Sequence, residues 1–367
     1  MNGDLEACSL HTDDANGTGG KLPVTVVTGF LGSGKTTLLS RILRDPALAN
    51  TAVLVNEIGE IGLDHHLLER VDETTVLLEN GCVCCTRRGE LADALRDLLE
   101  RESRGETGGG ALERVVVETS GLADPSPIPY TILSDPVLRH HYAPGRVVAT
   151  ADAVNGALHL RDNPESVAQI AASDTVCITK GDLADGQTVG DLEPSIQKIN
   201  PHARLVSAGS QVASDVFGSP QPQRDSTPGD AHPQTGRVSH SAHHLADNRS
   251  GGPGSVETLS LTFGEPLDWT AFGVWLSAVL HAHGEKVLRV KGLLDAGGPG
   301  PVSVNGVQHV IHPPHHLEHW PGDAGGDSGP QSSSERRSHL VFITRDVDTA
   351  TLEESLRAFT TLDHPAP

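Results

Sequence analysis

The fold of this chain is decided by one stretch, Gly29-Phe30-Leu31-Gly32-Ser33-Gly34-Lys35-Thr36. It follows an apolar run, Val24–Val27, that predicts a buried strand, and it precedes Thr37–Leu43, which predicts the start of a helix. A Gly-x4-Gly-Lys-Thr pattern between a strand and a helix is typical of a P-loop, whose backbone N–H groups and helix N-terminus bind phosphate. We expect the nucleotide phosphates to contact Gly29, Gly32, Ser33, Gly34, Lys35, Thr36 and Thr37.

Three side chains have expected catalytic roles. Lys35 is placed to reach the β- and γ-phosphates, and the Thr36 hydroxyl is placed to ligate Mg²⁺. A second apolar strand, Arg114–Val117, ends in Glu118-Thr119-Ser120-Gly121. An acidic residue at such a strand tip can bind Mg²⁺ through water or orient the attacking water, and Gly121 can offer an N–H to the γ-phosphate. Lys35, Thr36 and Glu118 are therefore the candidate catalytic residues.

A third motif bears on the choice of base. Thr179-Lys180-Gly181-Asp182 follows the apolar strand Asp174–Ile178 and resembles the Asn-Lys-x-Asp motif that recognises guanine. A carboxylate at Asp182 would accept the N1–H and N2–H₂ donors of guanine, which adenine does not present. Lys180 can lie along the base. Since Thr179 replaces the usual Asn, the sequence favours GTP without fixing how strictly ATP is rejected.

The cysteines form a cluster, Cys82-Val83-Cys84-Cys85, directly after a predicted strand at Thr75–Leu78. Three thiolates suit tetrahedral Zn²⁺, and Co²⁺ or Cu(I) would also accept them. Three ligands leave one coordination position open, which suits transfer of a metal better than permanent structural binding. The alternatives are a redox-sensing site and three inert buried cysteines.

Composition excludes several classes of protein. The 367 residues carry a formal net charge of −21, which argues against electrostatic binding of nucleic acid or of an anionic membrane. The sequence has no apolar run of membrane-spanning length and no signal peptide in residues 1–20. Five cysteines, with three of them clustered, do not form a secreted disulfide framework. We therefore expect a cytoplasmic protein with reduced thiols.

The order of predicted elements indicates an α/β P-loop NTPase with a mostly parallel sheet flanked by helices, followed by a small C-terminal α+β domain. The predicted segments are a disordered tail over 1–20, a GTPase domain over 21–210, a disordered His-containing linker over 211–255 and the C-terminal domain over 256–367. In the last segment, Asp268 is expected to cap a helix that ends at His283, and Asn305-Gly306 to form a hairpin turn.

The C-terminal domain is also rich in histidine. Its histidines either ligate a metal, face the GTPase domain or have a partly exposed structural role; they are His309, His312, His315, His316 and His319. Cys177 lies in an apolar run and is expected to pack in the core.

Together, the P-loop, the Cys-x-Cys-Cys cluster, Glu118–Gly121 and Thr179–Asp182 resemble the CobW-like branch of the G3E GTPases. Members of that branch act as metallochaperones or metal-insertion factors. The likeness continues through segments that resemble the CobW C-terminal domain, namely Leu288–Gly292, His312–Pro314 with Trp320, and Leu340–Ile343. The resemblance implies that Lys35 and Thr36 bind phosphate and Mg²⁺. It implies a metal site at Cys82, Cys84 and Cys85, with Glu60 as a candidate fourth ligand.

The resemblance implies a cytoplasmic GTPase that loads a transition metal, zinc before cobalt, onto a metal-requiring client protein. In this interpretation Mg·GTP orders the loop Asn56–His66 and the Gly121 loop, which completes the metal site, and hydrolysis loosens it. The alternatives are cobalt delivery for cobalamin biosynthesis, activation of a metalloenzyme such as nitrile hydratase, and a GTP-binding thiol redox sensor. No nucleic acid or membrane partner is expected.

Overall fold

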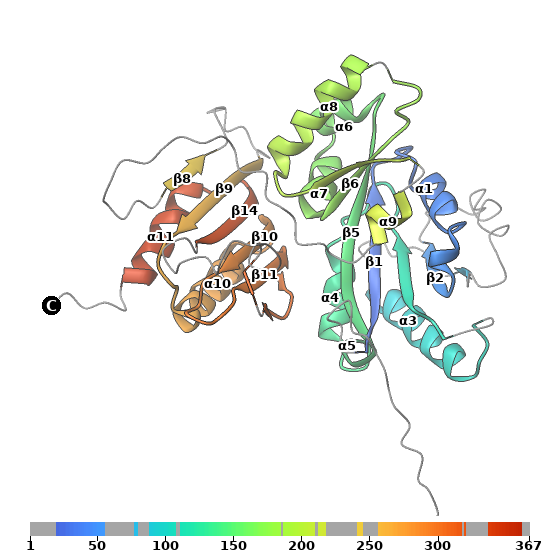
Figure 1. Ribbon diagram of the computed structural model, residues 1–367, viewed down its shortest axis with the longest axis horizontal. Coiled ribbons are helices and arrows are strands. Elements are labelled where there is room, and N and C mark those ends of the chain that lie inside the picture. Colours follow the sequence, from blue (N-terminus) through green and yellow to red (C-terminus); the bar gives the residue numbers. More distant parts are fainter. Residues whose placement is uncertain are drawn as a thin grey trace, which may run out of the picture.

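The computed structural model describes residues 20–55, 77–79, 88–107, 111–184, 186–209, 212–217, 241–244, 256–317, 319–320 and 337–361. Two bodies, each built on its own sheet, lie side by side (Figure 1). They correspond to the α/β domain and the α+β domain expected from the sequence. The residue boundaries given for these domains stay a prediction. The Cys-x-Cys-Cys cluster, Glu60, the loop Asn56–His66 and residues 1–19 lie outside the described residues.

The first sheet is parallel, as the sequence predicts. Its described strands run in the order β3-β2-β4-β1-β5-β6-β7, and neighbouring strands pair in parallel. They are β1 (Leu22–Gly29), β2 (Thr51–Val55), β3 (Leu77–Glu79), β4 (Arg114–Glu118), β5 (Tyr142–Asp152), β6 (Thr175–Thr179) and β7 (Arg204–Ser207). A parallel sheet is covered on both faces, so its strands are apolar runs; Val26, Val116 and Val148 are all buried.

Helices cover this sheet on both faces. They are α1 (Lys35–Ile42), η1 (Pro46–Leu48), α3 (Arg88–Ser103), α4 (Pro127–Ser134), α5 (Leu138–His141), α6 (Gly156–Asp162), α7 (Pro164–Ala172), α8 (Gly186–Ile199) and α9 (Val212–Phe217). Leu95 of α3 packs with Ile128 of α4 in one buried cluster, whereas Leu39 of α1 packs with Val216 of α9 in another. Figure 1 shows α4 and α7 on one side of β1 and β5, and α1 and α9 on the other. Within the described ranges, no helix is long and apolar enough to cross a membrane.

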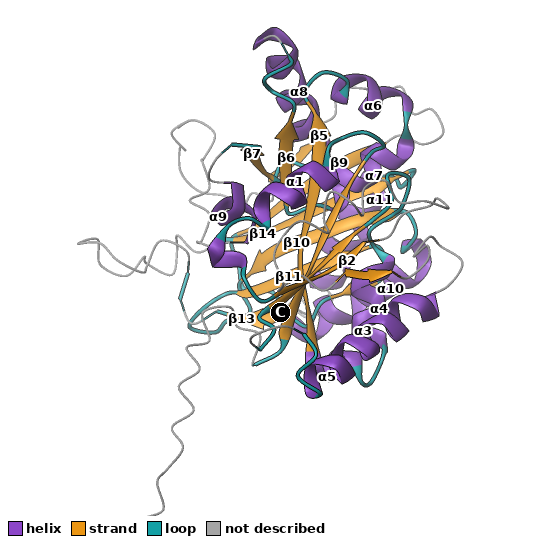
Figure 2. Cartoon of the chain, turned by 90° about the vertical axis from the view of Figure 1, so that its right-hand side faces the viewer, coloured by secondary structure: helices purple, strands orange, loops and turns teal. Residues whose placement is uncertain are grey.

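The second sheet is antiparallel, with the described strands in the order β12-β11-β10-β14-β9-β8 and with β13 paired to β11. The elements are β8 (Ser241–His244), β9 (Val256–Phe263), α10 (Trp269–His283), β10 (Val287–Leu294), β11 (Val302–Val307), β12 (Val310–Ile311), β13 (His315–His316), β14 (Ser338–Arg345) and α11 (Thr349–Thr361). Asp268 caps α10 as predicted, since its Oδ1 accepts a hydrogen bond from the Ala271 N–H at 2.7 Å. Trp275 of α10 packs against Phe342 of β14 in the core of this domain. Figure 2 shows the strands of both sheets in orange and the helices in purple.

The predicted turn at Asn305-Gly306 is wrong. Both residues lie inside β11, where Gly306 pairs with Val290 of β10. The chain turns instead at Gln308 and His309, and Gln308 has a φ of +52°. A Cβ at position 306 would lie 2.3 Å from a side-chain atom of the next strand. The glycine therefore permits a close approach of strands rather than a turn.

The stretch 211–255, predicted as a disordered linker, contains two ordered elements, so that prediction is wrong in part. In α9, Ala213 and Val216 are spaced three residues apart and are both buried in the core below the parallel sheet. Strand β8 pairs with β9, with Ala242 opposite Leu261. The rest of this stretch lies outside the described residues.

Candidate functional site

The P-loop lies at the carboxyl ends of the parallel strands. It leaves β1 at Gly29 and enters α1 at Lys35. Three neighbouring strands end beside it: β4 at Glu118, β5 at Asp152 and β6 at Thr179. Ligands of α/β proteins bind at this edge of the sheet, where the loops of several strands converge.

Three glycines of the loop have backbone conformations that other residues rarely adopt. The φ values of Gly29, Gly32 and Gly34 are +142°, +70° and +90°. A Cβ on Gly29 would lie 2.2 Å from Thr150 Oγ1, so the loop crosses β5 without space for a side chain. Gly34 is the N-cap of α1, which places the helix N-terminus and its unbonded N–H groups directly after the loop.

The Lys35 side chain contacts the backbone of its own loop. The Lys35 Nζ donates hydrogen bonds to the Gly29 carbonyl at 3.0 Å and to the Phe30 carbonyl at 3.3 Å. A neutral carbonyl is a weaker partner for an ammonium group than a phosphate oxygen is. The lysine can therefore exchange these carbonyls for nucleotide phosphates while its stem stays in place.

Thr36 and Glu118 meet at the end of the loop. The Thr36 Oγ1 donates a hydrogen bond to the Glu118 Oε1 at 2.7 Å, and Glu118 is only 2% exposed at the tip of β4. A hydroxyl and a carboxylate oxygen are hard donors of the kind that Mg²⁺ prefers. The donor set that the structure brings together therefore fits a magnesium ion.

Thr179 contacts the P-loop backbone. The buried Thr179 Oγ1 donates a hydrogen bond to the Ser33 carbonyl at 2.6 Å, and the Ser33 Oγ lies 2.6 Å from the Thr150 Oγ1. Two strands, β5 and β6, thus fix the conformation of the loop through short hydroxyl contacts. The support from Thr150 was not predicted from the sequence, because a threonine at a strand end carries no motif.

Asp152 is a further residue that sequence reasoning missed. It is 2% exposed at the end of β5, and its Oδ2 accepts a hydrogen bond from the Lys180 Nζ at 2.7 Å. Burial alone would raise the pKa of Asp152, but hydrogen bonds from Lys180, Val154 and Asn155 outweigh it and the pKa lies below its usual value. Lys180 has a φ of +57° and extends from the predicted base-recognition loop. A signal was available in the sequence. Asp152 ends one strand, β5, and Lys180 directly follows the next strand, β6.

Gly121 lies against the P-loop, as the predicted role in γ-phosphate binding requires. A Cβ at this position would lie 2.7 Å from the Leu31 Cα. The same loop is attached to β1, because the Thr119 N–H donates to the Val27 carbonyl at 2.9 Å and the Thr119 Oγ1 donates to the Thr28 Oγ1 at 2.8 Å. The Glu118–Gly121 segment and the P-loop therefore form one connected unit.

The remaining predicted residues have different outcomes. Thr37, directly after the P-loop, and Asp182, after β6, are both exposed. Cys82, Cys84, Cys85 and Glu60 lie outside the described residues. Within the described ranges, no group of three or more His, Cys, Asp or Glu is arranged to hold a metal.

The C-terminal histidines divide into three groups, one of which is His312 alone, half-buried beside Asn305. The His309 ring lies 5.2 Å from the Tyr130 ring of α4, so this histidine faces the P-loop domain, which is one of the predicted alternatives. His315, His316 and His319 are exposed. Cys177 is fully buried, which confirms its predicted place in the core.

Comparisons with known proteins agree with this geometry. The family described as "CobW/HypB/UreG, nucleotide-binding domain" matches residues 23–207, and "Cobalamin synthesis protein cobW C-terminal domain" matches residues 256–360. The chain is 30% identical over 340 residues to the protein named zinc chaperone YjiA of Escherichia coli, covering 92% of this chain and 97% of that protein. It is 32% identical over 226 residues to zinc-regulated GTPase metalloprotein activator 1 of Schizosaccharomyces pombe, covering 59% and 53% of the two chains.

A solved structure gives the same result for the fold. The crystal structure of Zn(II)-bound YjiA GTPase from E. coli superposes with a TM-score of 0.65 at 26% identity. The superposition covers 92% of this chain and 99% of that chain. The similarity therefore extends over both bodies.

Proposed function

This chain belongs to the CobW/HypB/UreG family of nucleotide-binding proteins, and we propose that it is a GTP-hydrolysing metallochaperone that transfers a transition metal to a client protein. The single observation that carries the nucleotide part is the contact between Thr36 and Glu118 at the end of a P-loop that also presents Lys35. The names of the relatives, zinc chaperone and zinc-regulated GTPase metalloprotein activator, support the metal part.

Each catalytic side chain has a proposed task. The P-loop N–H groups and Lys35 bind the phosphates and neutralise the charge that develops on the γ-phosphoryl group. Glu118 orients a water, and the Gly121 N–H meets the γ-phosphate. Mg²⁺, bound through Thr36, would further neutralise the phosphate charge. Asp182 recognises the guanine base.

The cargo is a transition metal bound by Cys82, Cys84 and Cys85, with Glu60 as the candidate fourth ligand. Thiolates suit both Zn²⁺ and Co²⁺, so ligand chemistry does not choose between them. We propose zinc because the relatives named above are zinc proteins. A cytoplasmic location follows from the same chemistry, since metal-binding thiols need a reducing compartment.

The strand register supports coupling between nucleotide and metal. Val55, the last residue of β2, pairs with Glu118 of β4 on one side and with Glu79 of β3 on the other. The loop Asn56–His66 therefore starts directly after Val55, and the cysteine cluster starts soon after Glu79, at the edge that holds the P-loop. We propose that GTP orders this region and completes the metal site, and that hydrolysis loosens it.

The test is a metal titration against a chromophoric chelator, with Zn²⁺ and Co²⁺ separately, in Mg·GDP and in Mg·GTPγS. We expect metal affinity to rise about tenfold or more in the triphosphate state, within the range typical of coupled sites. Cys84→Ala should abolish the effect, and Cys8→Ser, which lies outside the cluster, should preserve it. Equal metal affinity in Mg·GDP and Mg·GTPγS would show that nucleotide binding and metal binding are not coupled, which would contradict that part of the proposal.

The alternatives predict different results. In cobalt delivery, or activation of an enzyme such as nitrile hydratase, the Co²⁺ titration would show the larger nucleotide response. In a GTP-binding thiol redox sensor, Cys84 would oxidise reversibly and GTP turnover would be indifferent to either metal. The same titration, repeated after mild oxidation, separates these cases.

A further inference from the structure

Gln169 of α7 contacts the loop that follows Glu118. The side chain is 1% exposed, and its Nε2 donates one hydrogen bond to the Gly121 carbonyl and one to the Ala123 carbonyl, each at 3.1 Å. Both hydrogens of one amide group are thus used on two carbonyls of the same loop.

These contacts determine the direction of the peptide groups beside Gly121. The Ser120 carbonyl accepts a hydrogen bond from the Ala123 N–H at 3.1 Å, and Gln169 binds the Gly121 carbonyl. In a trans peptide the C=O and N–H point in opposite directions. The N–H groups of Gly121 and Leu122 are therefore fixed on the opposite side of the backbone from these two bonded carbonyl oxygens.

The packing between the P-loop and α7 is incomplete. A cavity between the P-loop and α7 is lined by Phe30, Ser33, His159 and Gln169, among other residues. Leu122 is 49% exposed, so its side chain does not anchor the loop in the core. The amide of Gln169 is thus the contact through which α7 fixes the conformation of the loop.

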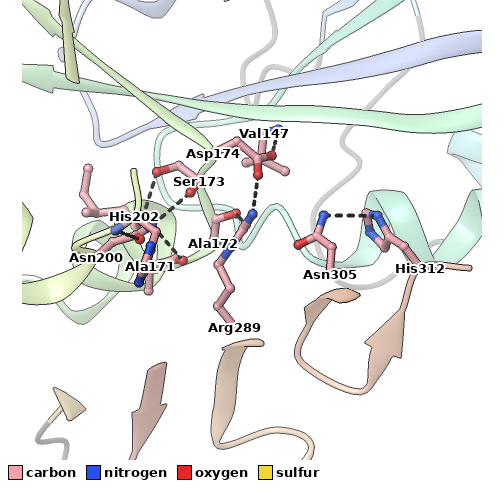
Figure 3. Close-up of polar contacts among 11 residues, drawn as sticks. Val147, Ala171, Ala172, Ser173, Asp174, Asn200, His202, Arg289, Asn305 and His312 are labelled. Atoms are coloured by element: carbon pink, nitrogen blue, oxygen red, sulfur yellow. Dashed lines mark hydrogen bonds and ion pairs between the residues drawn. The ribbon is translucent and has the colours of Figure 1, made fainter. Parts of the chain in front are cut away.

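Helix α7 is itself attached to the C-terminal domain. Ala171 packs with Leu288 and Ile343, and the Ala172 carbonyl accepts a hydrogen bond from Arg289, which also pairs with Asp174 (Figure 3). The buried contacts at the carboxyl end of α7 restrain the helix that carries Gln169. A rigid supporting element is what a positioning residue needs.

We propose that Gln169 is a positioning residue for GTP hydrolysis, which orients the Gly121 loop so that its N–H groups meet the γ-phosphate. This inference rests on the proposed GTPase function and specifies how the loop distinguishes GTP from GDP. Hydrogen-bond donors that are oriented before the reaction stabilise the charge of the transition state without reorganisation, so a small misplacement lowers the rate.

The experiment compares Gln169→Leu with a matched control, Asn200→Leu. Asn200 is also an amide that is 1% exposed, and its Nδ2 donates to the carbonyls of Ile170 at 3.0 Å and Ser173 at 2.9 Å. It thus binds carbonyls at the carboxyl end of the same helix rather than those of the Gly121 loop. For each variant we would measure kcat and KM for GTP, the affinities for GTPγS and GDP, and Tm, all without transition metal.

For Gln169→Leu we expect kcat to fall about 10- to 100-fold, the size associated with misplaced reacting groups. GTPγS affinity should fall severalfold while GDP affinity is unchanged. Asn200→Leu should lower Tm at least as much, with kcat and both affinities unchanged. Equal losses of GTPγS and GDP affinity, or equal kcat in the two variants, would overturn the proposal.

A second variant keeps the test decisive if Gln169→Leu does not fold. In Gln169→Glu the shape is preserved, but an ionised carboxylate cannot donate to the two carbonyls. Protonation restores one donor, so the ratio of its kcat to that of the wild type should rise as pH falls. A flat ratio contradicts the positioning role. Because no zinc is present, failure of metal transfer would leave this result untouched.

Discussion

The two ends of the parallel sheet both bury charged groups, but with different partners. At the carboxyl end, Asp152 pairs with Lys180 of the predicted base-recognition loop, and Glu118 accepts a hydrogen bond from Thr36. At the amino end of β6, Asp174 pairs with Arg289 of the C-terminal domain and also accepts from the Val147 N–H at 2.9 Å. One end contacts the candidate ligand site and the other contacts a second domain.

The difference is whether a ligand can replace the partner. Lys35 donates to two loop carbonyls, which phosphate oxygens can substitute at a gain in charge complementarity. Arg289 is 2% exposed and donates to Asp174 and to the Ala172 carbonyl, so no ligand can reach it without separating the domains. Buried charge thus indicates a functional site at one end and a structural junction at the other.

The largest expected effect tests the carboxyl end. Lys35→Ala removes the cation that we propose reaches the β- and γ-phosphates, so kcat/KM for GTP should fall about 10³-fold or more, as for loss of a major charge-stabilising group. Steady-state phosphate release measures the rate, and circular dichroism measures Tm. Tm should fall less than for a buried ion pair, because Lys35 Nζ donates to two neutral carbonyls of its own loop. A large fall in Tm would mean that the lysine is structural, which would remove the contrast between the two ends.

The next effect tests the amino end. Arg289→Met removes the guanidinium that pairs with the Asp174 carboxylate, and breaking a buried pair of this kind costs about 3 kcal/mol or more. Urea unfolding would be followed by tryptophan fluorescence, because Trp269, Trp275 and Trp320 are the three tryptophans and all belong to the C-terminal region.

A double-mutant cycle sharpens this prediction. Adding Asp174→Asn to Arg289→Met should recover part of the loss, since the uncompensated charge is then gone. GTP affinity should stay within about threefold of wild type in all three variants, a change below 1 kcal/mol. A loss of nucleotide binding equal to that of Lys35→Ala would show that the junction is not separate from the ligand site.

The sequence located the P-loop at the carboxyl end because the signals of that motif are local. Gly29–Thr36 is one continuous motif, and its three unusual φ values need glycine at fixed positions. Asp152, Thr150 and Gln169 were missed because each acts on a residue far away in the sequence. The amide of Gln169, for example, contacts Gly121 and Ala123, which are 48 and 46 residues earlier.

The amino end of the sheet and the predicted Asn305-Gly306 hairpin show where prediction from the sequence fails. Arg289 lies in β10 and Asp174 lies directly before β6, 115 residues away, and no local pattern links them. Asn305-Gly306 is a strong local turn signal that tertiary packing overrides, because Gly306 lies where the neighbouring strand leaves no space for a Cβ. Sequence patterns therefore predict motifs whose residues are adjacent in the chain better than they predict contacts between domains.

A smaller effect concerns pH at the amino end. Burial lowers the pKa of His312, the nearby Asp174 carboxylate raises it in part, and Arg289 lowers it further, so the net shift is downward. The folded state therefore binds the proton less readily than the unfolded state, whose histidine pKa is about 6.5. Stability is complete above that value and is lost as pH falls from it toward the folded pKa, at up to about 1.4 kcal/mol per pH unit.

Urea unfolding at pH 7.5 and 5.5 measures this loss. His312→Asn should reduce the pH dependence, whereas His316→Asn, an exposed histidine of the same domain, should preserve it. The His312 Nδ1 lies 3.4 Å from the Asn305 Nδ2, a contact that suits a neutral ring accepting a hydrogen bond. An unchanged pH dependence in His312→Asn would assign the loss to other groups.

The smallest effect returns to the carboxyl end, where Thr179 occupies the position of the usual Asn. Its hydroxyl donates to the Ser33 carbonyl at 2.6 Å, so Thr179→Ala should weaken GTP binding about fivefold, the value of one ordinary hydrogen bond near 1 kcal/mol. Because the bond supports the P-loop rather than the base, ATP affinity should fall by the same factor in a fluorescent-nucleotide competition assay. Thr179→Ser keeps the hydroxyl and serves as the control, whereas Asp182→Ala should weaken GTP alone. A loss in Thr179→Ala that is confined to GTP would place this side chain at the base and would contradict its role in supporting the loop.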